Sequence, residues 1–153
     1  MNNPERALNY LGLARRGGNL VIGEEPVGIA CRSSHARLLI LAQDAADHTF
    51  RRARSFTPNG KPPVIRVPFD KEQLGNALGV NACAMVALTD VSLALAFVKS
   101  LDEDEHYAML LQTLEEQVDR VRKRRSEEKA HQKNLRQGKH KPAKPMKPAK
   151  KAE

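Results

Sequence analysis

The sequence contains no tryptophan, and aromatic residues make up only 4% of its 153 residues. A folded core must therefore consist mainly of aliphatic side chains. No stretch approaches the roughly 18 consecutive apolar residues of a membrane span. The first residues, Met-Asn-Asn-Pro-Glu, do not resemble a secretory signal. We therefore expect a cytoplasmic protein that does not enter a membrane.

Cysteine is almost absent as well. Cys31 and Cys83 are the only two, and neither belongs to a C-x-x-C pair. Single cysteines within apolar runs are typical of buried thiols. A zinc site with His35 would need more ligands at close spacing than the sequence supplies. The sequence therefore predicts no metal site.

No catalytic motif is present. His35, His48 and His106 are widely spaced, and no G-x-S-x-G or H-E-x-x-H pattern contains a potential active-site residue. The sequence also has no G-x-x-x-x-G-K-[ST] or G-x-G-x-x-G loop for a nucleotide. Asp44 and Asp47 can be interpreted as paired carboxylates, but their position just after an apolar run favours capping of a helix. We therefore expect no enzyme activity and no cofactor.

Positive charge is unevenly distributed along the chain. The net charge of +8 comprises +4 in residues 1–100, −7 in residues 101–119 and +11 in residues 120–153. The last segment has 14 Lys and Arg against 3 acidic residues. Such a segment attracts polyanions, because each neutralised phosphate releases condensed counterions. A solubilising tail is the alternative interpretation.

Helix and strand signals alternate through residues 1–100. Helix starts are indicated by Pro4, by Gly23, by the capping-box pattern from Asp70 to Gln73, and by Asp90. Apolar runs typical of strands occupy residues 20–22, 38–42, 64–67 and 84–88. Strands separated by helices indicate a mostly parallel sheet between helical layers. We predict an α/β fold, a three-layer α/β/α sandwich around a four-stranded mixed, mostly parallel sheet.

Three segments are expected along the chain: a domain at residues 1–100, an acidic-then-basic helical extension at 101–136, and a disordered Lys/Pro-rich tail at 137–153. The acidic cluster at 102–105 favours the start of the C-terminal helix. An apolar stripe follows at heptad-like spacing: Tyr107, Leu111, Leu114, Val118 and Val121. We expect the stripe to pack against the domain, in a monomer, rather than to form a dimer.

Gly23, Glu24 and Glu25 form the most informative short segment. They follow a strand and begin a helix, where backbone N–H groups lack partners and can bind phosphate. Gly23 permits close approach of a backbone, and the two carboxylates can accept hydrogen bonds from base amino and imino groups. Alternatively, the acids only complement the helix dipole.

Four arginines flank this segment in the sequence: Arg15, Arg16, Arg32 and Arg37. If they lie on one rim with Gly23, they are placed to bind a phosphate backbone. A further cluster, Arg51, Arg52 and Arg54, is not included in this set.

Several blocks together resemble a known family. These blocks are Leu11–Gly18 (LGLARRGG), Gly23–Glu25, Ala36–Asp44 (ARLLILAQD), Leu74–Gly79 and Ala84–Asp90. Their order and composition resemble the kink-turn RNA-binding ribosomal protein superfamily of the L-seven-Ae/L-thirty-e type, and within it the bacterial YlxQ-like proteins. The resemblance covers about residues 5–100.

The resemblance implies a non-catalytic protein that binds structured RNA. In the family, the turn after the first strand recognises sheared G·A pairs, and a loop before the last strand contacts an extruded base. These correspond here to Gly23–Glu25 and to Val80, Asn81 and Ala82. The family's Asn-Glu pair falls on Glu25 and Pro26, and its lysine on Ile29. Expected partners are ribosomal RNA and ribosomal or translation-related proteins. The alternative is a protein-assembly module with weak or non-specific RNA binding, docking through residues 107–121.

Overall fold

The computed structural model describes residues 4–101, 103 and 105–136, so the tail expected at 137–153 lies outside the described residues. The chain divides into two compact units, Met1–Gln117 and Val118–Glu153. The segment boundaries expected at residues 100 and 136 stay predictions. Among the described helices, none combines the length and apolar character needed to cross a bilayer.

The described elements follow the expected alternation. In chain order they are α1 (Pro4–Arg16), β1 (Leu20–Ile22), α2 (Glu24–Arg32), β2 (Leu38–Leu41), α3 (Asp47–Phe56), β3 (Val64–Arg66), α4 (Lys71–Leu78), β4 (Met85–Leu88), α5 (Val91–Ser100) and α6 (Ala108–Arg136).

The four strands form one mixed sheet in the order β1-β4-β2-β3. β4 pairs antiparallel with β1 and with β2, and only β2 and β3 are parallel. The expectation of a mostly parallel sheet is therefore wrong. A helix makes two strands parallel only when it crosses back to the starting edge of the sheet. Here the chain after α4 returns to the start of that helix, where Cys83 N donates to Lys71 O at 2.9 Å, and β4 begins at the edge where β3 ends.

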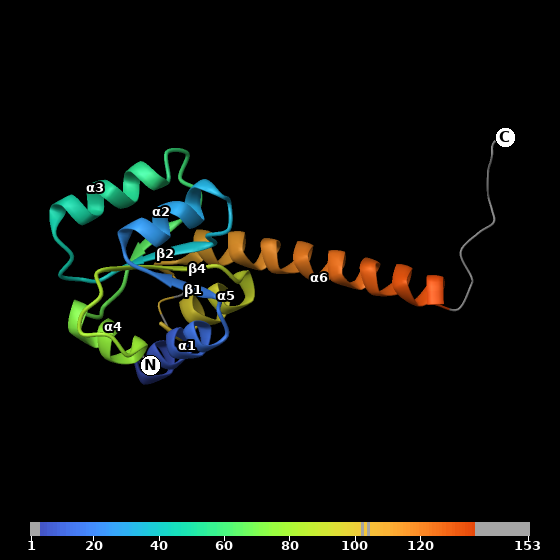
Figure 1. Ribbon diagram of the computed structural model, residues 1–153, viewed down its shortest axis with the longest axis horizontal. Helices are drawn as coiled ribbons and strands as arrows, with labels where there is room; N and C mark the ends of the chain where they lie inside the picture. The colour runs from blue at the N-terminus through green and yellow to red at the C-terminus, as the bar shows by residue number, and fades with distance from the viewer. Residues whose placement is uncertain (1–3, 102, 104, 137–153) are drawn as a thin grey trace. The chain divides into compact units, whose positions relative to one another are not determined.

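Helices cover both faces of the sheet (Figure 1), which confirms the α/β fold. α2 and α3 lie on one face, and α1, α4 and α5 lie on the other. All four residues of β2 are fully buried, as are Val86 and Ala87 of β4. Leu39, Leu41 and Ala87 belong to the core beneath α2 and α3. Their neighbours along each strand point to the opposite face, because side chains alternate in a strand.

Helix caps follow the sequence where the partners are local. Asp70 forms the complete capping box with Gln73, and Asp90 Oδ2 accepts from Leu93 N at 3.0 Å. The expectation that Asp44 and Asp47 cap the third helix is wrong. Ala46 is its N-cap, and no side chain caps it. Asp44 Oδ1 accepts a hydrogen bond from Lys71 N at 2.9 Å instead, at the start of α4.

The apolar stripe begins in the first unit. Tyr107, Leu111 and Leu114 are buried there, which confirms packing within the chain for this part of the stripe. Burial raises the pKa of the Tyr107 hydroxyl, and the nearby Glu103 carboxylate raises it further. α6 begins at Ala108, so the expectation that the acidic cluster starts this helix is wrong for its described residues, Glu103 and Glu105.

We predict that Gly75→Ala destabilises the fold. A Cβ at this buried position would lie 2.8 Å from Asn81 C and O and from Val80 O. Overpacking costs about 1–3 kcal/mol, and the helix propensity of alanine offsets up to about 1 kcal/mol. The free energy of unfolding in urea should fall by about 1–2 kcal/mol. Gly17→Ala is the control, because its closest contact is the flexible Asn19 side chain at 3.1 Å. Equal stability of the two variants would contradict the prediction.

Candidate functional site

Gly23 forms the turn between β1 and α2. Its N–H donates to Met85 O at 2.9 Å, which attaches the turn to the start of β4. Gly23 has φ 96° and ψ 160°, a region that is essentially restricted to glycine. The predicted helix start is confirmed, and the backbone conformation explains why this residue is glycine.

The first turn of α2 presents few amide donors. Val27 N donates to Gly23 O at 3.1 Å, and Pro26 has no N–H. The amides of Glu24 and Glu25 are therefore the ones directed out of the helix start. Glu25 is exposed, so its carboxylate can reach a ligand. This end offers two N–H donors and a carboxylate acceptor, a combination that suits a base edge with both acceptors and N–H donors better than a phosphate alone.

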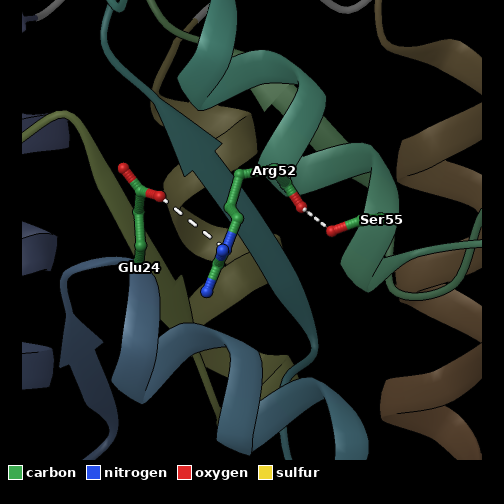
Figure 2. Close-up of polar contacts among 3 residues, drawn as sticks. All are labelled: Glu24, Arg52 and Ser55. Carbon is green, nitrogen blue, oxygen red and sulfur yellow. Dashed lines mark hydrogen bonds and ion pairs between the residues drawn. The ribbon is translucent and has the colours of Figure 1, made fainter.

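Glu24 forms an ion pair that the sequence did not indicate. Its Oε1 lies 3.8 Å from Arg52 Nε on α3, and Figure 2 shows the two side chains directed toward each other across the gap between the helices. Arg52 also lies over the Phe56 ring, 5.4 Å from its centroid. Ser55 Oγ donates to Arg52 O at 2.6 Å. The i,i+4 spacing of Arg52 and Phe56 was the one sequence signal here, and it indicates the contact between these two side chains rather than the ion pair.

The second predicted loop, Val80–Ala82, follows the left-handed C-cap Gly79 of α4. Val80 N donates to Gly75 O at 2.8 Å, which folds the loop back onto the helix. Cys83 N then donates to Lys71 O at 2.9 Å, so both ends of the loop are fixed. Asn81 and Ala82 are exposed between these anchors. Hydrogen bonds at both ends thus hold the exposed middle of the loop in place.

The turn and the loop lie at the same edge of the sheet. Ile22, the last residue of β1, pairs with Val86 near the start of β4. The segments before β4 and after β1 therefore meet where Gly23 bonds Met85. The structure thus brings together the two segments that the family resemblance selected.

The four predicted arginines do not form one rim with Gly23. Arg32 and Arg37 lie between the end of α2 and the start of β2, and Arg37 N donates to Leu88 O at 2.7 Å at the opposite edge. The Arg15 guanidinium lies near the second loop. Its Nη1 is 3.5 Å from the position that a Cβ on Gly79 would occupy. Arg16 lines a groove between α1 and α4. All four are exposed, and their role in RNA contact stays a prediction.

The remaining candidates for chemistry are the two thiols. Cys83 is buried and Cys31 is half-buried. Burial raises the pKa of both thiols, and the neighbouring Arg32 guanidinium partly lowers that of Cys31. Within the described part of the chain, no three His, Cys, Asp or Glu side chains are grouped to hold a metal ion.

Comparison with known proteins gives consistent relatives. The RNA-binding protein YlxQ of Bacillus subtilis strain 168 is 32% identical over 96 residues, covering 60% of this chain and 91% of that protein. YlxQ of Enterococcus faecium is 27% identical over 77 residues, covering 50% and 74%. No family model matches the chain.

Solved structures agree on the fold. A protein of unknown function from Bacillus halodurans has a TM-score of 0.59 and 30% identity, covering 64% of this chain and 98% of that one. The 15.5kD RNA-binding protein of Giardia lamblia has a TM-score of 0.52 at 17% identity, covering 65% and 84%. The chain belongs to the YlxQ family within the L-seven-Ae superfamily.

We predict that Gly23→Ala costs more stability than Gly60→Ala. Gly23 is in a region that alanine adopts only at a cost of about 1–3 kcal/mol. Gly60 has φ 71°, and a Cβ added there would meet nothing within 4 Å, so alanine at this position should cost only about 1 kcal/mol. Urea unfolding of both variants measures the difference. A Gly60→Ala variant that is less stable than Gly23→Ala would contradict the assignment of the strained turn.

Proposed function

We propose that this chain is a non-catalytic RNA-binding protein that recognises kink-turn-like RNA through the Gly23–Glu25 turn and the Val80–Ala82 loop. The observation that carries the proposal is the hydrogen bond from Gly23 N to Met85 O, which holds both segments at one edge of the sheet. The YlxQ relatives, which are named RNA-binding proteins, support it. The protein works in the cytoplasm and associates with ribosomal RNA.

Recognition at the turn depends on Glu25. Glu24 is engaged by Arg52 at 3.8 Å, whereas Glu25 is exposed and adjacent to the helix start. A carboxylate there accepts hydrogen bonds from guanine imino and amino groups and would repel a phosphate. The turn therefore contacts base edges, and cations elsewhere must hold the backbone.

Two positions distinguish this site from the wider superfamily pattern. Pro26 supplies no amide donor and no polar side chain, and Ile29, at the family's lysine position, is 59% exposed. Since neither side chain bonds to RNA, we infer weaker phosphate contact at α2 than a lysine would give. The 14 basic residues of 120–153 compensate with sequence-independent affinity.

We predict that Glu25→Ala weakens binding to a kink-turn duplex about tenfold, the effect of losing a charge-assisted hydrogen bond. Glu25→Gln, which keeps one acceptor oxygen, should fall between the wild type and the alanine variant. Fluorescence anisotropy with labelled RNA measures the affinities, and Glu105→Gln, exposed and distant in sequence from the turn, is the control.

The same titrations use a duplex in which the tandem G·A pairs are replaced by Watson–Crick pairs. The wild type should bind it more weakly than the kink-turn duplex. Equal affinity for the two duplexes would exclude kink-turn recognition, although RNA binding of another kind would remain.

We also predict that deleting residues 120–153 reduces the salt dependence of binding. Each lost phosphate contact lowers the slope of log affinity against log salt by about 0.7–0.9. The first compact unit ends at Gln117, so the deletion leaves this unit complete, and its thermal unfolding serves as the control. An unchanged slope would place the electrostatic contacts on the first unit instead.

A further inference from the structure

A hollow lies at the edge where β2 and β3 begin, opposite the Gly23 turn. The end of α2 and the segment after it form one side, the loop before β3 forms another, and the first turns of α6 close it. Its volume is about 450 Å³. We call it the base hollow, and its principal lining residues are Cys31, Arg37, Lys61, Pro63, Met109 and Gln117.

One polar atom in the base hollow has no partner. Gln117 Oε1 is buried and accepts no hydrogen bond from any described residue. Buried acceptors are nearly always bonded, because an unsatisfied one loses its hydration without compensation. Gln117 lines the hollow, and a ligand that carries an N–H donor would reach the oxygen once the side-chain amide turns toward the hollow.

The walls of the base hollow suit a flat, largely apolar group. Pro62, Pro63, Leu110 and Met109 contribute apolar surface, and Met109 is 84% exposed. Methionine sulfur makes favourable contacts with aromatic rings, so Met109 can contact the face of a nucleobase. An aromatic ring with N–H groups on its edge matches both the walls and the amide.

The charge around the base hollow favours an anion. Arg37 and Lys61 line it, and Lys61 also lines an adjoining hollow that includes Arg32. These three side chains are exposed. Among the described residues that line the two hollows, none is Asp or Glu. An anionic chain would therefore meet Arg37 and Lys61 in the base hollow and Arg32 beside it.

We propose that the base hollow seats one nucleobase of a single-stranded RNA segment, with Arg37 and Lys61 binding the adjacent phosphates. The Gln117 side-chain amide, turned toward the hollow, accepts a hydrogen bond from an amino or imino group of that base. The inference rests on the proposed RNA binding and adds a second contact surface to it. A segment of a protein partner would need acidic residues to match the same cations and gains no specific support from the apolar walls.

Alkylation of Cys31 tests occupancy in the unaltered full chain. Cys31 lines the base hollow and is half-buried, whereas Cys83 is buried elsewhere and serves as the internal reference. Adenosine octaribonucleotide at saturating concentration should slow the reaction of iodoacetamide with Cys31 several-fold, as followed by mass spectrometry. An unchanged rate, or no binding of the octanucleotide, would overturn the proposal. Protection that rises with protein concentration without RNA would also overturn it, because a second copy would then be the occupant.

Three variants test the individual contacts. Gln117→Leu should bind adenosine octaribonucleotide about fivefold more weakly, the effect of one hydrogen bond. Lys61→Gln and Arg37→Gln should each lower the slope of log affinity against log salt by about 0.7. Arg51→Gln is the matched control, because Arg51 is exposed on α3 and lines neither hollow. Slopes for Lys61→Gln and Arg37→Gln equal to that of Arg51→Gln would contradict the phosphate contacts.

An abasic octamer of ribose phosphates separates base insertion from general charge attraction. It should bind more weakly than adenosine octaribonucleotide and should not protect Cys31. Equal protection by the two oligomers would overturn the base seat. Affinity for the kink-turn duplex, measured with Gln117→Leu and Lys61→Gln, should stay unchanged. Loss of kink-turn recognition in the wild type with Cys31 protection intact would reject the proposed function alone, and the reverse result would reject this inference alone.

Discussion

Strand β4 pairs antiparallel with both β1 and β2, and the position of each candidate contact depends on this pairing. Because β4 begins beside the end of β1, the loop that precedes it meets the turn that follows β1, and Gly23 N bonds Met85 O at 2.9 Å. A parallel β4 would carry Val80–Ala82 to the other edge. The buried strands also keep this edge rigid, since their residues are covered on both faces.

The contact between Arg52 and Glu24 depends on the close approach of α2 and α3 at Gly28. A Cβ at Gly28 would lie 2.8 Å from two Phe56 ring carbons, so only glycine lets this ring pack on α2. Phe56 in turn lies beneath the Arg52 guanidinium at 5.4 Å, and Arg52 reaches Glu24. The packing that Gly28 permits thus brings Phe56 and Arg52 beside α2, where Arg52 reaches Glu24, while Glu25 is exposed.

Interactions within one helical turn were predictable from the sequence, whereas those between distant segments were not. The capping box of Asp70 and the cap of Asp90 have partners three residues away, and both were identified. Asp44 accepts a hydrogen bond from Lys71 N, 27 residues away at the start of α4. The sequence therefore suggested the right kind of hydrogen bond but placed it at α3 instead of α4. The direction of β4 was mispredicted for the same reason, because the segment before β4 returns to the start of α4, where Cys83 N donates to Lys71 O, 12 residues earlier in the chain. Family resemblance located the turn and the loop, but it gave no indication of Arg52.

The two edges of the sheet differ in chemistry in a way that limits how RNA can bind. The edge at Gly23 offers carboxylates, which reject phosphate and accept base N–H groups. The opposite edge offers Arg32, Arg37 and Lys61, and no acidic residue lines the described hollows there. β2 has four residues and therefore spans about 13 Å, a separation that a few nucleotides can cross. An RNA whose folded part docks at Gly23 would reach the base hollow with a short single-stranded extension. Arg37 and Lys61 would then lie on the path of that extension and would add to the Arg15 guanidinium near the Val80–Ala82 loop, so that two separate surfaces of one domain would contribute to RNA affinity.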